Sequence, residues 1–285
     1  MTEQTHDLIS VVVATYNRAD ALDAVLRSLA RQTDGNFEVL VADDGSGPDT
    51  GRLVADWGAR MPVPLKHVWH DDRGFRLAEI RNRAVLAAAG AYFIFIDGDC
   101  IARRDFVAAH RRLAEPGWFV AGNRILLSPQ LTHAVLDDAL EPEQWGLGKL
   151  AHERVRGGVN RLLPVFNLPL GRLRRIAPDM WIGARGANLA VTRVDLERVD
   201  GFEASFNSWG LEDSDFVIRL LHAGVRRKDG RFATGLFHLW HPEADRSRLM
   251  ENQHRLDELL HSDRVRAHRG LSQLAAEPHA AGGTQ

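Results

Sequence analysis

Short apolar runs alternate with amphipathic stretches along the first hundred residues. The apolar runs are rich in β-branched or aromatic residues, which predicts strands at residues 8–14, 37–42, 65–69 and 91–96. Apolar positions at helical spacing predict helices between these strands, at residues 19–31, 50–57 and 77–89. Strands that alternate with helices predict an α/β fold with a mostly parallel central sheet flanked by helices.

The pattern of the second half is less regular. It predicts a helix at 104–113, a helix that starts near Glu212 and ends at Gly224, and strands at 117–122, 186–191 and 231–240. Residues 129–178 are mixed and rich in turn formers, with no clear period. A last helix is predicted near 247–260, followed by a tail at 275–285 that we expect to be disordered.

The apolar run 91–96 ends abruptly in Asp97-Gly98-Asp99. Burying unpaired charge is costly, so two carboxylates at the end of a buried strand are not explained by packing. In open α/β sheets this edge is where ligands bind, and a divalent cation with a phosphate partner would satisfy both carboxylates. A polar turn that closes the strand is the alternative, since Asp-Gly is a common turn pair. These residues alone leave both interpretations open.

Two further acidic groups follow the same pattern. Asp43 and Asp44 end the second predicted strand, and Glu212, Asp213 and Asp215 begin a helix. The helix dipole favours acids at that position, although three so close together repel one another. His238 and His241 end a late predicted strand, where one of them would complete a metal site with the Asp97 and Asp99 carboxylates or serve a structural role instead.

Bulk properties exclude several classes of protein. The 285 residues carry a net charge of −2, which predicts no nucleic-acid partner. The one cysteine, Cys100, excludes an internal disulfide, fits a reducing compartment and is interpreted as a packing residue. We find no signal-peptide pattern, no membrane-length apolar run, no Gly-x-Gly-x-x-Gly and no Walker motif. We therefore expect a cytoplasmic protein, either soluble or peripheral at the inner membrane face.

Residues 150–176 are rich in arginine, with six arginines against Glu153 as the one acid. Leucines, valines and a phenylalanine lie between the arginines. A solvated insertion with a small core of its own explains this composition. The alternative is an interfacial segment that meets anionic lipid or a lipid-linked acceptor.

Taken in order, the motifs resemble those of the family 2 glycosyltransferases, which have the GT-A fold. The resemblance covers residues 8–242 and rests on Val11–Arg18, Val41–Ser46, Asp97-Gly98-Asp99, Asn188 before Asp200–Phe202, and Trp209–Asp213. Residues 72–82 look nearest to chondroitin-polymerase-like transferases and to the galactosyltransferase C-terminal module. Ala14 stands where proline is common, and residues 129–178 match no part of the pattern.

The resemblance implies a role for each matching residue. Asp213 would be the general base, Glu212 would hold hydroxyls of the acceptor or sugar, and Trp209 would stack on a sugar. Asp97, Asp99 and one of His238 and His241, preferably His241, would bind Mn²⁺ or Mg²⁺. The nucleotide and donor sugar would lie against ten residues: Ala14, Thr15, Tyr16, Arg18, Asp44, Arg76, Arg81, Asn82, Asp97 and Asn188.

The function implied is that of an inverting, metal-dependent hexosyl- or N-acetylhexosaminyltransferase. It would move a sugar from a nucleotide donor, UDP-linked by preference, to a hydroxyl of a glycan or lipid-linked acceptor in polysaccharide or glycoconjugate synthesis. Residues 1–100 would be the Rossmann-like nucleotide-sugar half, 101–245 the acceptor and catalytic half of the same GT-A domain, and 246–285 a terminal helix and tail. The alternatives are a non-catalytic nucleotide-sugar or carbohydrate-binding protein and, as a weaker candidate, a nucleotidyltransferase.

Overall fold

A seven-stranded sheet runs through the centre of the computed structural model, which describes residues 8–137, 140–242 and 249–277. The strand order is β3 (Leu65–Trp69), β2 (Phe37–Asp43), β1 (Ile9–Thr15), β4 (Tyr92–Asp97), β8 (Asn188–Thr192), β6 (Trp118–Ala121) and β9 (Arg226–Asp229). The first four strands are parallel, β8 is antiparallel to both its neighbours, and β9 is parallel to β6. The predicted α/β class and mostly parallel sheet are confirmed.

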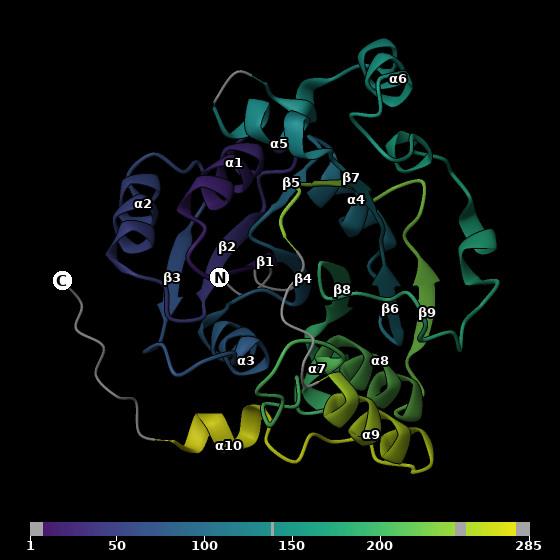
Figure 1. Cartoon of the computed structure of the whole chain (residues 1–285). Helices are drawn as coiled ribbons and strands as arrows, with labels where there is room; N and C mark the ends of the chain where they lie inside the picture. The colour runs from purple at the N-terminus through teal and green to yellow at the C-terminus, as the bar shows by residue number, and fades with distance from the viewer. Residues whose placement is uncertain (1–7, 138–139, 243–248, 278–285) are drawn as a thin grey trace, which may run out of the picture.

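The two faces of the sheet carry separate layers of helices (Figure 1). Side chains alternate along β1, so that Val11 and Val13 join one core and Val12 joins the other. The first core is covered by α1 (Ala19–Ala30), α2 (Pro48–Gly58), α4 (Phe106–Leu113) and α5 (Pro129–Leu136). The second is covered by α3 (Leu77–Ala87), α7 (Arg193–Arg198), α8 (Glu212–His222) and α10 (Leu271–Ala276).

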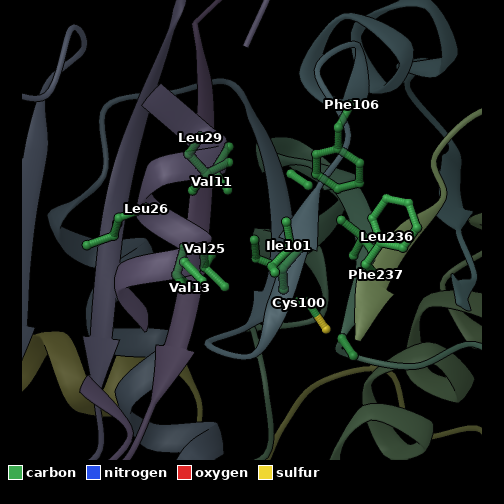
Figure 2. Packing of buried hydrophobic residues seen from close by; sticks show 14 of the residues in the cluster. Val11, Val13, Val25, Leu26, Leu29, Cys100, Ile101, Phe106, Leu236 and Phe237 are labelled. Carbon is green, nitrogen blue, oxygen red and sulfur yellow. The ribbon is translucent and has the colours of Figure 1, made fainter. Parts of the chain in front are cut away.

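A small second sheet brings distant segments to the end of β4. It consists of β5 (Cys100–Ala102), β10 (Leu236–His238) and β7 (Arg124–Leu126), with β10 in the middle. Figure 2 shows Cys100, Ile101, Leu236 and Phe237 packed together in the first core. In this register His238 lies opposite Cys100, and the Leu239 amide donates to the Asp99 carbonyl at 2.9 Å. The late histidine is thereby placed beside the acidic turn.

Two expectations for the second half are wrong in part, and one strand was missed. The strand predicted over 231–240 is limited to β10, and β9 was missed because its Arg226-Arg227-Lys228-Asp229 sequence has no apolar pattern. The predicted disordered tail begins too early, since Ala275 and Ala276 belong to α10, while residues 278–285 lie outside the described residues. The predicted terminal helix is present as α9 (Leu249–Leu260).

The arginine-rich segment does not have a core of its own. Its elements are α6 (Leu147–Val155) and two 3₁₀ turns, Leu163–Val165 and Gly171–Arg175. Leu150 and Val165 are buried in the first core, so the segment packs onto the main body of the fold. Among the described residues, no helix is long and apolar enough to cross a bilayer.

Candidate active site

Two adjoining cavities lie at the carboxyl edge of the parallel strands, where ligands bind in open α/β sheets. The first has a volume of about 680 Å³, and nine residues predicted for the site line it: Ala14, Thr15, Tyr16, Arg18, Asp44, Asp97, Asp99, Trp209 and His241. The second has a volume of about 890 Å³ and is lined by five more: Arg81, Asn188, Glu212, Asp213 and His238. Asp97, Trp209 and His241 line both cavities, so the acidic turn lies at their junction.

The Asp97-Gly98-Asp99 turn is held against the end of β1. The Gly98 amide donates to the Ala14 carbonyl at 2.6 Å, and a Cβ on Gly98 would lie 2.9 Å from that same oxygen. Glycine is therefore required between the two aspartates. Asp99 is largely buried, yet its carboxylate faces two imidazoles rather than capping the turn. This contact favours a ligand site over a simple polar turn.

The two imidazoles lie on either side of the Asp99 carboxylate. His238 Nε2 is 3.5 Å from Asp99 Oδ1, and His241 Nε2 is 3.4 Å from Asp99 Oδ2. Two atoms that share one Mn²⁺ or Mg²⁺ at about 2.1 Å lie roughly 3 to 3.5 Å apart, so these distances fit a common cation. Burial lowers the pKa of His238, which favours the neutral imidazole that a metal requires. The donor set therefore fits Mn²⁺ or Mg²⁺, and both histidines remain candidates.

Cys100 also lies within reach of this group. Its Sγ is 3.5 Å from Asp99 Oδ1, but the side chain is fully buried, and burial raises the pKa of the thiol well above its usual value. A neutral thiol is a poor ligand for a hard cation, so Cys100 fits the packing role expected of it.

Arg81 lies between the acidic turn and the start of α8. Its guanidinium donates to Asp97 Oδ1 at 2.9 Å and lies 3.6 Å from Glu212 Oε1, while the residue is 2 % exposed. Arg81 lines the second cavity, and among the described residues its buried Nε and Nη1 atoms have no hydrogen-bond partner. Arg81 therefore couples Asp97 to Glu212 as well as lining the cavity.

Glu212 and Asp213 occupy different environments on the first turn of α8. Burial, and then the neighbouring Asp213 carboxylate, raise the pKa of Glu212 to about 7. Asp213 is only partly buried, and its Oδ2 accepts a hydrogen bond from the Gly186 amide at 3.1 Å. Two adjacent carboxyl groups with such different surroundings suit different roles.

Removing the Glu212 charge should change how stability depends on pH. The folded protein binds this proton more tightly than the unfolded chain, so its contribution to the free energy of unfolding is lost as pH rises from about 4.5 through about 7. Glu212→Gln has no such loss. We therefore compare the free energy of unfolding of Glu212→Gln with that of the parent at two pH values. The difference should shift in favour of the variant by about 2 kcal/mol as pH rises from about 5 to about 8. Denaturant unfolding at both pH values measures this, and an unchanged difference would contradict the raised pKa.

The turn directly before Glu212 and Asp213 has an unusual backbone conformation. Gly210 and Leu211 have φ values of 100° and 74°, so two successive residues are in left-handed regions. A leucine in this region is rare and costs energy, which marks a backbone held by its surroundings. Trp209, before the turn, lines both cavities, and Glu212 and Asp213, after it, line the second.

The third acid of this group, Asp215, has a structural role. It accepts from Arg219 at 2.6 Å and from Arg264 at 2.8 Å, and both Asp215 and Arg219 are almost fully buried. These pairs connect α8 to the segment after α9. Asp215 is therefore unavailable to a substrate in either cavity.

Asp44 lies in a hydrogen-bond network that sequence reasoning missed in part. Its Oδ1 pairs with His70 Nε2 at 2.7 Å, and its Oδ2 accepts from the Arg76 amide at 2.9 Å. The half-exposed Tyr16 donates its hydroxyl to Asp72 at 2.9 Å. His70 directly follows β3, so a search for polar residues at the carboxyl end of every strand would have found it.

Three predicted donor-binding residues have other contacts in the structure. Asn82 lies outside both cavities, fully buried, and pairs through both ends of its amide with the Phe202 backbone at 2.8 Å. The Arg76 side chain turns away toward Asp71 and Glu79. Asn188 lines the second cavity, but its amide is bonded to the Asn123 and Thr234 carbonyls and to His110. The side chains of Asn82 and Asn188 thus connect backbone segments that are far apart in the sequence.

Comparison with known proteins places the chain in a family. The family described as glycosyl transferase family 2 matches residues 10–155, and the one described as the N-terminal domain of galactosyltransferase matches residues 178–242. Validoxylamine A glucosyltransferase of Streptomyces hygroscopicus subsp. jinggangensis is 34% identical over 242 residues, which is 80% of this chain and 55% of that protein. Chondroitin synthase of Escherichia coli is 28% identical over 76% of this chain and 33% of its own length. The chain thus spans about half or less of these relatives.

Solved structures agree on the fold. The mannosyltransferase PcManGT from Pyrobaculum calidifontis, in complex with GDP-Man and Mn²⁺, matches 94% of this chain and 68% of its own, with a TM-score of 0.60 and 19% identity. TarS 1–349 of S. aureus in complex with UDP matches 93% of this chain and 68% of its own, with a TM-score of 0.59 and 16% identity. The predicted GT-A fold is confirmed, and the chain belongs to glycosyl transferase family 2.

Proposed function

We propose that the protein is an inverting, metal-dependent glycosyltransferase that uses a nucleotide-sugar donor. The acceptor is a hydroxyl of a glycan or of a lipid-linked molecule. The observation that carries this proposal is the position of Asp213 in a cavity that adjoins, through Asp97 and His241, the cavity of the Asp97-Gly98-Asp99 turn. A base for the acceptor and a site for the leaving diphosphate are thereby in reach of one sugar.

The residues of the second cavity suit activation of an acceptor hydroxyl. A sugar hydroxyl is a poor nucleophile, so a carboxylate must take its proton as it attacks. Asp213 is oriented by the Gly186 amide and takes this role. Glu212, whose pKa is raised to about 7, is protonated in about half of the molecules at neutral pH and holds a hydroxyl instead. Attack from the side opposite the diphosphate inverts the anomeric configuration and requires no covalent intermediate.

The first cavity suits the nucleotide. The Thr15-Tyr16 turn and Asp44 would hold the base and ribose, with Arg18 at the same wall. Asp99 with His238 or His241, together with Asp97, would hold Mn²⁺ or Mg²⁺. Such a cation, when bound, stabilises negative charge on the leaving diphosphate.

UDP-sugars are our first candidates for the donor. TarS structures contain UDP and UDP-GlcNAc, whereas the PcManGT structure contains GDP-Man, so the fold accommodates both classes of nucleotide. A binding protein without turnover is the alternative to an enzyme, and a nucleotidyltransferase is the weaker one. The paired carboxylates at both cavities argue against a binding protein, because binding alone needs no base.

Thermal unfolding with nucleotide-sugars tests the donor. We expect one of UDP-glucose, UDP-N-acetylglucosamine, GDP-mannose and TDP-glucose to raise Tm when Mn²⁺ is present. At a donor concentration of 100 Kd, mass action adds about 2.7 kcal/mol, which raises Tm by roughly 5 to 10 °C for a chain of this size. A donor that raises Tm and then yields free nucleotide diphosphate with an acceptor supports the enzyme. Stabilisation without turnover over a broad acceptor set would favour the binding protein.

A further inference from the structure

Residues 147–182, hereafter the interfacial segment, hold an unusual share of the exposed apolar surface. In Figure 1 this segment runs from α6 along the outer side of the molecule beside β9, on the side opposite α2. Nine of the eighteen large apolar side chains that are exposed among the described residues lie in it: Leu147, Val155, Leu163, Phe166, Leu168, Leu173, Ile176, Met180 and Ile182. Single exposed apolar residues are normal, but such a concentration marks a contact surface.

Basic side chains are interleaved with these apolar residues. The segment contains seven Lys or Arg residues and only Glu153 and Asp179 as acids, although the whole chain carries 36 basic and 38 acidic residues. The side chains of Arg154, Arg161 and Arg172 form no ion pair or hydrogen bond with any residue of the described ranges. The exposed surface of this segment is therefore both apolar and cationic, whereas the rest of the chain is net acidic.

We propose that the interfacial segment binds the surface of an anionic lipid bilayer. Apolar side chains enter the boundary between headgroups and acyl chains, and the arginines meet lipid phosphates from the same segment. A protein interface is a poorer fit, because the core of such an interface is depleted of charge, and here unpaired charges lie between the apolar residues. Charge complementarity thus selects an anionic membrane as the occupant.

A recess between the interfacial segment and α4 suits a lipid headgroup. A cavity of about 670 Å³ lies between α4 and the Gly171–Arg175 turn, with Arg112, Arg172 and Lys228 in its wall. Lys228 and Arg175 share Glu115, whereas Arg112 and Arg172 have no partner among the described side chains. Two unpaired guanidinium groups in one recess suit a phosphate.

The proposed surface also adjoins the acceptor side of the active site. Arg161, within the segment, and Gly183 and Arg185, just after it, line the same cavity as Asp213. An acceptor anchored in a bilayer would then approach this cavity from the side of the segment. This inference does not depend on the transfer chemistry, because membrane binding is measurable without a nucleotide.

Co-sedimentation with vesicles tests the proposal. At about 0.1 M salt the parent should bind phosphatidylglycerol vesicles, and it should bind less to phosphatidylcholine vesicles or at high salt. Leu163→Asp with Ile176→Asp, at positions 61% and 77% exposed, should weaken binding about tenfold or more. The matched control is Val194→Asp with Met250→Asp, at 66% and 87% exposed on α7 and α9, which should bind as the parent does.

A second pair of variants tests the charges. Arg154→Gln with Arg172→Gln should weaken binding at least about tenfold and reduce its salt dependence, because each arginine near an anionic surface is worth about fivefold. Arg52→Gln with Arg60→Gln, which removes two exposed arginines near the opposite side, should have little effect.

Failure of the parent to bind vesicles, or an equal loss of binding in the control variants, would overturn the proposal. A dimer of the parent that Ile176→Asp dissociates, without vesicle binding, would also overturn it in favour of an interface between copies.

Discussion

Replacing Asp213 with asparagine is expected to reduce sugar transfer by on the order of 10²-fold or more while leaving nucleotide affinity unchanged. The substitution keeps the size of the side chain and its acceptor for the Gly186 amide, but it removes the basicity. Asp213 lines the second cavity only, so the nucleotide cavity should be unaffected. Initial rates with an identified acceptor, measured beside calorimetric nucleotide affinity, provide the test.

Glu212→Gln is the matched comparison for this variant. It changes the neighbouring carboxyl group by the same chemistry, and the glutamine resembles the protonated acid that the raised pKa indicates. We expect it to weaken use of the acceptor or donor sugar and to leave a functional base in place. Normal turnover by Asp213→Asn would place the base elsewhere. Glu212 would then be the next candidate, because Asp215 is already paired with two buried or half-buried arginines.

Replacing Asp99 with asparagine is expected to abolish the metal dependence of nucleotide binding. In the parent, calorimetry should show UDP binding that is tighter with Mn²⁺ than with a chelator. In Asp99→Asn the two affinities should converge, at a cost of about 10- to 100-fold in the presence of metal, because the carboxylate between the two imidazoles is lost. Equal affinities in the parent would show instead that the turn has no metal role.

The two histidines should be distinguished by the same measurement. His238→Ala and His241→Ala remove one imidazole each, and the ligand is the residue whose loss reproduces Asp99→Asn. Cys100→Ser is the matched control on the adjacent strand, since its buried thiol faces the same carboxylate. It should retain the metal dependence, and loss of that dependence would add the thiol to the ligand set.

Sequence periodicity was sufficient to predict the first half of the fold. Strands β1, β2 and β4 bury both faces and read as mostly apolar runs, while α1 places its apolar residues on one side. The motifs at strand ends followed from the same reasoning. Asp44 and the Asp97-Gly98-Asp99 turn end parallel strands, and they line one cavity in the structure. Local pattern and global fold agree in this half, so the prediction needed no tertiary information.

The same reasoning failed where contacts between distant segments decide the structure. β9 consists entirely of charged residues, and it forms because β6 offers it a parallel edge. Arg174 lies in a run of arginines that looks solvated, yet it is buried and donates to the carbonyls of residues 168, 229, 231 and 232. Backbone carbonyls belong to every residue, so a side chain that binds them leaves no signal in the sequence.

The sequence by itself therefore determined the α/β class, the order of the first-half elements and which segments carry the site residues. Only the tertiary structure decided how those residues are used. It placed His238 and His241 on either side of Asp99 and committed Asn82 to the Phe202 backbone. The periodicity of apolar residues indicates which face of a helix or strand is buried. The partner of a polar side chain depends instead on strand register and on contacts between residues far apart in the sequence.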